Sequence, residues 1–127
     1  MKNDLSALLQ QVSTLPEFAG RELDVNMRAV SGDLPVHAAS AWQNKDAIDT
    51  LLAHGADINS VGGAGETPLF RVIREGSEEF LRFLLLRGAN VAVQNADGVS
   101  PAEVAREVGD SGMVAIMDML ARRRHPA

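Results

Sequence analysis

Apolar residues recur at intervals of three and four along three segments of the chain. They stand at Ile48, Leu51 and Leu52, at Phe80, Phe83 and Leu84, and at Met113, Ile116, Met117 and Leu120. This spacing gathers apolar side chains on one face of a helix. The pattern therefore predicts helices over 44–54, 77–87 and 110 to about 124, and none of them can bury its apolar face alone.

Proline and glycine repeat with a fixed period around these segments. The 33-residue spacing holds for Pro35, Pro68 and Pro101 and for Gly32, Gly65 and Gly98. Proline suits the first helical position because its φ is already helical and it has no N–H to leave unpaired. We therefore expect a first helix to begin at each proline, so that one period holds a turn and two helices.

The residues around the prolines repeat as well. The chain reads Gly-Asp-Leu-Pro-Val-His-Ala-Ala at 32–39 and Gly-Glu-Thr-Pro-Leu-Phe at 65–70, with Gly-Ala-Asp-Ile-Asn at 55–59 and Gly-Ala-Asn-Val at 88–91. The period and both motifs resemble the ankyrin-repeat family. The resemblance implies an all-α fold, a solenoid of stacked helix-turn-helix units joined by short β-hairpin-like loops.

The resemblance also divides residues 1–127, as a single domain, into four units. Residues 31–63 and 64–96 are expected to be full repeats, and residues 97–124 a C-terminal cap. An Asp-Val-Asn sequence at 24–26 precedes the Asp-Ile-Asn sequence at 57–59 by 33 residues, which makes residues 3–29 a degenerate N-terminal cap. Stacking of the units would supply the hydrophobic core.

The residues before the prolines predict how each first helix is capped. Thr67 and Ser100 place a hydroxyl where the first free N–H groups need an acceptor, and Ser100 with Glu103 has the spacing of a capping box. Leu34 stands at the same position and has no acceptor, which we expect to cost about 1 kcal/mol.

The turn between the two helices differs in the first full repeat. Gly76 and Gly109 occupy this turn in the later units, where a left-handed residue ends the first helix. Gln43 stands there in the first full repeat, so we expect the left-handed position to shift to Asn44, which tolerates that conformation.

Composition and charge narrow the possible functions. The 127 residues carry a net charge of -5 and no cysteine, so a nucleic-acid partner, a disulfide framework and a thiolate site are not expected. No run approaches the roughly 20 apolar residues of a membrane span, and no signal-peptide pattern precedes the first helical segment. We expect a cytoplasmic protein that does not act at a membrane.

Candidate catalytic and metal-binding motifs are weak. The glycine-rich stretch 61–67 lacks the lysine of a phosphate-binding loop and is interpreted as a flexible loop tip. The three histidines have no second ligand at metal spacing, and the resemblance gives His37 a hydrogen bond between neighbouring turns. We predict no cofactor, no metal and no enzymatic activity. The enzyme alternative would use a carboxylate pair such as Glu66 with Glu75, with a raised pKa.

The family resemblance implies a protein-binding surface on the concave side, formed by loop tips and inner faces of the first helices. The predicted contact residues are Asp33, Ala41, Trp42, Glu66, Arg71, Arg74, Glu75, Glu107 and Val108, and Ala38, Val99 and Val104 are further exposed positions. Trp42 either contacts a partner or packs on the N-terminal cap near Leu8 or Leu9, and both possibilities stay open. The acidic balance of these residues favours a partner with a basic surface.

We therefore expect a non-catalytic protein-protein interaction module that is a monomer when free. The alternative within the same class is a small inhibitor or immunity protein that neutralises a toxin or an enzyme. A self-associating structural protein is a further alternative, and it would need exposed apolar residues at Leu8, Leu9, Leu15 or Phe18.

Overall fold

The computed structural model describes residues 5–15, residue 18 and residues 24–123. Within that part of the chain the regular structure is helical throughout, which confirms the predicted all-α fold. The helices are α1 (Leu5–Ser13), α2 (Pro35–Ala41), α3 (Lys45–Ala53), α4 (Pro68–Glu75), α5 (Glu78–Leu86), α6 (Pro101–Val108) and α7 (Ser111–Arg123), with a short 3-10 turn η2 (Gly63–Gly65). None of these described helices is long and apolar enough to cross a membrane.

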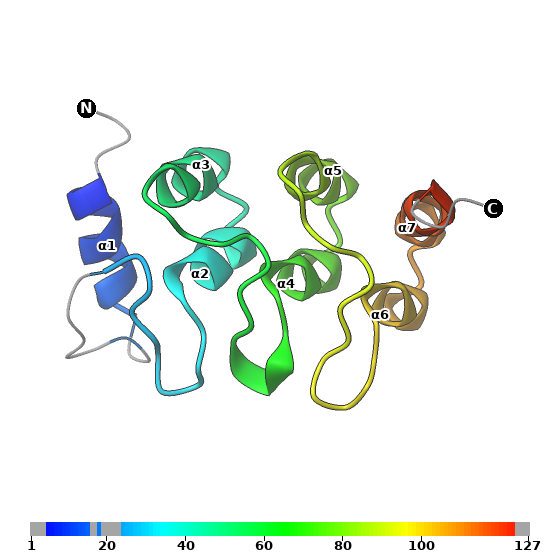
Figure 1. Cartoon of the computed structure of the whole chain (residues 1–127), viewed down its shortest axis with the longest axis horizontal. Helices are drawn as coiled ribbons and strands as arrows, with labels where there is room; N and C mark the ends of the chain where they lie inside the picture. The colour runs from blue at the N-terminus through cyan, green and yellow to red at the C-terminus, as the bar shows by residue number, and fades with distance from the viewer. Residues whose placement is uncertain (1–4, 16–17, 19–23, 124–127) are drawn as a thin grey trace.

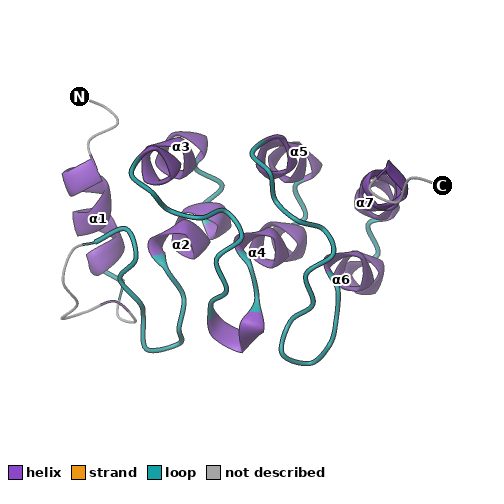
Figure 2. Cartoon of the chain, in the orientation of Figure 1, coloured by secondary structure: helices purple, strands orange, loops and turns teal. Residues whose placement is uncertain are grey.

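The helices form two layers, as Figures 1 and 2 show. The first helices of the repeats, α2, α4 and α6, lie side by side in one layer, and α3, α5 and α7 form the other. The loops between repeats extend from the α2, α4 and α6 layer toward the same side (Figure 2). We call the first layer the inner layer and the second the outer layer.

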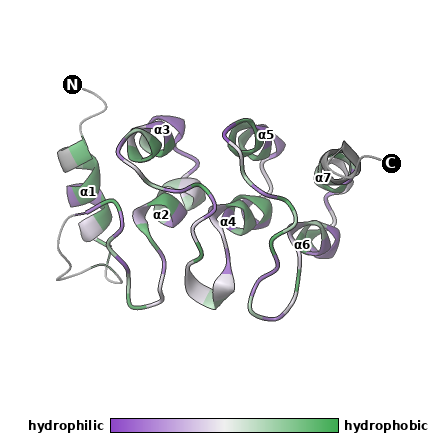
Figure 3. Ribbon diagram, viewed as in Figure 1, coloured by the Kyte–Doolittle hydropathy of each residue, from purple (hydrophilic) through white to green (hydrophobic). Residues whose placement is uncertain are grey.

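The core lies between the two layers and between successive repeats. Each helix has hydrophobic and hydrophilic stretches (Figure 3), and the apolar residues of the predicted helical faces are largely buried. Ile48, Leu51 and Leu84 are fully covered, as are Met113 and Met117. Burial of such side chains contributes roughly 1.5–3 kcal/mol each, so stacking of repeats provides most of the stability.

The N-terminal helix α1 covers the open end of α2 and α3. Leu9 and Phe18 are buried, and Leu8 and Leu15 are partly buried against the same core. The exposed apolar surface that the self-association alternative required at these four positions is therefore absent. The boundaries of the four units stay predictions.

The capping of the first helices follows the sequence at one position and departs from it at another. Ser100 and Glu103 form the expected capping box, since the Glu103 N–H donates to Ser100 Oγ at 3.2 Å and the Ser100 N–H to Glu103 Oε1 at 3.1 Å. The hydroxyl of Thr67, expected to act in the same way, makes no cap and is buried without a hydrogen-bond partner. Leu34 supplies no side-chain cap, as expected.

The turn between α2 and α3 shows that the predicted shift to Asn44 is wrong. Gln43 itself adopts the left-handed conformation, with φ of 55°, close to Gly76 at 82° and Gly109 at 81°. Asn44 is extended and caps α3 by accepting a hydrogen bond from the Ala47 N–H at 3.0 Å. The second helices are one residue shorter at each end than predicted where both ends are described, because the polar first residue is a cap outside the helix.

Candidate functional site

The C-terminal ends of the inner helices form a continuous exposed surface. Ala41, Arg74 and Glu107 stand at one position of successive repeats, and Trp42, Glu75 and Val108 stand at the next. All six are exposed, and the helices that carry them are neighbours. We call these six residues the inner stripe. It brings together six of the nine predicted contact residues.

Trp42 and Val108 give the inner stripe two accessible apolar side chains. Trp42 is 37% exposed and Val108 is 48% exposed. Glu75 lies between them in the order of repeats, and its carboxylate forms no ion pair within the described residues. The surface therefore combines apolar contact area with an available negative charge.

The remaining predicted contact residues form a polar network beneath the stripe. Glu66 is only 2% exposed, so the expectation of an exposed side chain at this position is wrong, while its contact with a partner stays a prediction. Arg74 donates to both carboxylate oxygens of Glu66, Asn95 donates to Oε2 at 3.0 Å, and Arg71 lies 3.5 Å from Oε1. Asp33 in turn accepts from Arg71 at 2.8 Å. These groups join neighbouring loops to α4. Val104, which was also expected to be exposed, is buried as well.

The network keeps Glu66 ionised. Burial alone would raise the pKa of its carboxyl, but hydrogen bonds from Arg74 and Asn95 and the charges of Arg74 and Arg71 hold the pKa below its usual value. A general acid at neutral pH needs a raised pKa. The carboxylate pair required by the enzyme alternative is therefore contradicted at Glu66.

His37 links two successive loops. Its Nδ1 accepts the Leu34 N–H at 3.1 Å, so Nε2 carries the proton and donates to the Glu66 carbonyl oxygen at 2.8 Å. Burial lowers the pKa of the imidazole, which keeps it neutral and suited to these two opposite roles. The hydrogen bond between neighbouring turns, implied for His37 by the family resemblance, is confirmed. Among the described residues no group of three or more His, Asp or Glu side chains could hold a metal ion.

The glycine-rich stretch, predicted to be a flexible loop tip, packs closely against neighbouring loops at Gly62 and Gly65. A Cβ at Gly62 would lie 2.7 Å from Asp33 Oδ1 and from the His37 ring, and one at Gly65 would lie 2.6 Å from the Ala96 backbone nitrogen. The Ala96 N–H also donates to the Ala64 carbonyl oxygen at 2.9 Å. Glycine is required here by close approach of the chain rather than by a phosphate.

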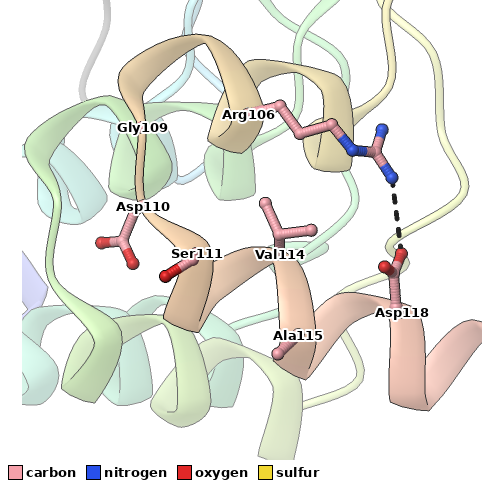
Figure 4. A pocket seen from close by; sticks show the side chains of 7 residues that line it. All are labelled: Arg106, Gly109, Asp110, Ser111, Val114, Ala115 and Asp118. Carbon is pink, nitrogen blue, oxygen red and sulfur yellow. Dashed lines mark ion pairs between the residues drawn. The ribbon is translucent and has the colours of Figure 1, made fainter.

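The outer face of α6 and α7 carries a shallow pocket of about 440 Å³ (Figure 4). Arg106 reaches across it to Asp118 at 3.7 Å, and Asp110 Oδ1 accepts the Met113 N–H at 3.0 Å. Arg106 stands 33 residues after the buried Ile73. A charged pair thus replaces apolar surface at the end of the stack, as a capping repeat requires. The charged groups that line the pocket, Arg106, Asp118 and Asp110, already have partners.

Comparison with known proteins identifies the repeat. A family model for ankyrin repeats in many copies matches residues 36–85. ADP-ribosylation factor GTPase-activating protein AGD2 of Arabidopsis thaliana is 36% identical over 74 residues, which cover 58% of this chain and 10% of that protein. Arf-GAP with coiled-coil, ANK repeat and PH domain-containing protein 2 of Gallus gallus is 32% identical over 105 residues, or 80% of this chain and 13% of that protein.

A shorter relative also matches this chain over part of its length. Ankyrin repeat and SOCS box protein 11 of Mus musculus is 33% identical over 84 residues, which cover 65% of this chain and 26% of that protein. The chain therefore matches only a small part of the length of each of these relatives. The similarity extends to their repeats and not to the activities in their names.

Proposed function

We infer, from the premise that this chain belongs to the ankyrin-repeat family, that it is a protein-protein interaction module that binds its partner through the inner stripe. Ankyrin repeats as a class support protein interaction. The observation that carries the choice of surface is the row of six exposed residues at the ends of α2, α4 and α6, one of which, Arg74, also belongs to the polar network.

The apolar members of the stripe suit the centre of an interface. Tryptophan is among the residues that dominate measured interface energies, because a partner can cover a large rigid ring at a small cost in entropy. The exposed part of Trp42 and the Val108 side chain are separated by a single repeat. A partner segment that spans α2 to α6 would cover both.

The charges of the stripe favour a basic partner. Arg74 is the only cation among the six residues, and both of its terminal nitrogens already donate to Glu66. Glu75 and Glu107 are exposed carboxylates with no ion pair in the described part of the chain. Lysine or arginine residues of a partner would therefore find acceptors here, which would speed association and set specificity.

The proposal includes no catalytic step, cofactor or metal. We further propose, on sequence grounds alone, a cytoplasmic location and a monomeric free protein. An inhibitory or immunity role would use the same surface, and no residue of the stripe distinguishes it from scaffolding.

Quantitative capture from a native lysate tests the surface. Wild-type protein is compared with Trp42→Ala and Glu75→Lys, and we expect both variants to lose the same partner by at least about tenfold. Arg74 is left intact because its loss would disturb Glu66. Asp46→Lys makes the same charge change on α3 in the outer layer and serves as the matched control. Equal capture by wild type and both stripe variants would exclude the inner stripe.

A further inference from the structure

A second exposed surface lies between α5 and α7 in the outer layer, away from the inner stripe. A groove of about 370 Å³ is lined by Leu85, Leu86, Ile116 and Met119, with Arg82 as its charged residue. Leu86 is 83% exposed and Met119 is 54% exposed. Exposed apolar side chains that gather in one groove mark interaction surfaces, whereas single exposed ones do not.

Both apolar residues occupy the same position of successive repeats. Leu86 and Met119 are 33 residues apart, and the equivalent residue of α3 is Ala53. The outer helices also approach one another less closely than the inner helices do. At this repeat position, large apolar side chains therefore stand on α5 and α7, and the small alanine stands on α3.

The preceding groove, between α3 and α5, is closed by charged side chains. Arg87 on α5 donates to both oxygens of Asp49 on α3, at 2.7 and 3.1 Å, and its guanidinium lies 3.7 Å from the centre of the Phe83 ring. Lys45 on α3 donates to Glu79 on α5 at 2.8 Å. These bridges cross the groove between α3 and α5.

The same bridges are missing one repeat later because the residues have changed. Arg82 stands at the position of Asp49, and Leu120 stands at the position of Arg87. Gly112 stands at the position of Glu79, so no acidic side chain extends from α7 at this point. Arg82 is 60% exposed, and its ion pair within the described residues is a 3.6 Å contact with Glu78 of its own helix.

We propose that this groove is a second docking site, which accepts an amphipathic helix of a protein partner with an acidic residue beside its apolar face. The apolar residues of that helix would lie between Leu86 and Met119, and its carboxylate would pair with Arg82. Helices commonly dock in this way, with apolar residues at i, i+3, i+4 and i+7. An acidic helix is favoured because Arg82 is the charged residue among the described side chains that line the groove, and its ion pair among them is made along its own helix and not across the groove.

A second copy of this chain fits the groove less well. A stable dimer needs about 800 Å² of buried surface on each partner, and five of the side chains that the structure describes line the groove. Because it lies in the outer layer, occupation of the groove is independent of the inner stripe. One chain could then hold two proteins at once, which goes beyond the single-site function proposed above.

Synthetic peptides provide the test. Two helix-stabilised peptides of about 14 residues carry leucines at i, i+4 and i+7 on an alanine and glutamine background, and differ only in one glutamate or lysine beside the leucines. Binding to the full chain is measured by fluorescence anisotropy and located by NMR amide shifts. We expect the glutamate peptide to bind about tenfold more tightly than the lysine peptide, with shifts along α5 and α7.

Substitutions separate the contributions. Leu86→Ser with Met119→Ser should weaken binding of the glutamate peptide by about tenfold or more, and Arg82→Glu should reverse the preference in favour of the lysine peptide. Val30→Ser, which removes an 80% exposed apolar side chain elsewhere, is the matched control and should change nothing. Trp42→Ala should also leave peptide binding unchanged. Failure of the groove proposal can therefore be distinguished from failure of the inner-stripe proposal.

Several outcomes would overturn the proposal. They are equal affinity for the two peptides, no amide shifts along α5 and α7, and a charge preference that Arg82→Glu does not reverse. A wild-type dimer that Leu86→Ser dissociates would show that a second copy fills the groove instead. Binding that appears only after removal of residues 124–127 would identify the chain's own C-terminus as the occupant.

Discussion

Gln43 is the position where a single substitution should stabilise this fold. Its φ of 55° costs a non-glycine residue about 1–2 kcal/mol, and glycine removes that cost. Glycine also has more conformational freedom in the unfolded chain, which opposes folding by about 0.5–1 kcal/mol. The exposed Gln43 side chain contributes no hydrogen bond in the described structure. We therefore expect Gln43→Gly to raise the free energy of unfolding by about 0.5–1 kcal/mol. For a chain of this size that corresponds to about 2–4 °C in Tm, measured by circular dichroism.

Two further variants decide whether the reasoning is right. Asn44→Gly should be neutral or slightly destabilising, because Asn44 is an extended N-cap and glycine caps less well. Gly76→Ala should lower the free energy of unfolding by about 1 kcal/mol through backbone strain alone, since a Cβ there would meet no atom within 4 Å. If Asn44→Gly raised the Tm and Gln43→Gly did not, the left-handed residue of this turn would be Asn44 and not Gln43.

Four substitutions test polar groups of the inner layer and its loops. Thr67→Val should leave the denaturation midpoint unchanged or raise it, because the hydroxyl has no partner, whereas Ser100→Ala should cost about 1 kcal/mol. Glu66→Gln should cost about 1.5–3 kcal/mol in denaturant unfolding; because the pKa of Glu66 is lowered, its contribution is present above the usual carboxyl pKa and is lost as pH falls through the folded value. The pKa of His37 lies below 6.5, so the unfolded state binds protons first and Tm should fall as the pH drops below 6.5. His37→Gln should flatten the dependence of Tm on pH, and an unchanged dependence would refute the contribution of His37.

Local sequence signals predicted most of the fold because the signals are themselves local. Proline at the first helical position and apolar spacing of three and four act within one helix, and the helices lie where these patterns placed them. The burial of Glu66 could not be read in the same way, because it depends on Asn95 from the next loop and on Arg74 in α4. The missing cap at Thr67 could not be predicted from the sequence either. Thr67 and Ser100 both carry a hydroxyl at the same repeat position, and only Ser100 forms the cap.

The candidate surfaces depend on differences between repeats rather than on the repeat itself. Core positions of the outer helices keep their apolar character from one unit to the next, as at Leu51, Leu84 and Met117, because each unit must bury its face on its neighbour. Exposed positions on the inner and outer layers need not be apolar, and there the type of side chain changes from one repeat to the next. On the outer layer Asp49 gives way to Arg82 at the same position, which turns a bridged groove into an open one with an available cation. The change in side chains at these positions therefore distinguishes the bridged groove between α3 and α5 from the proposed docking site between α5 and α7.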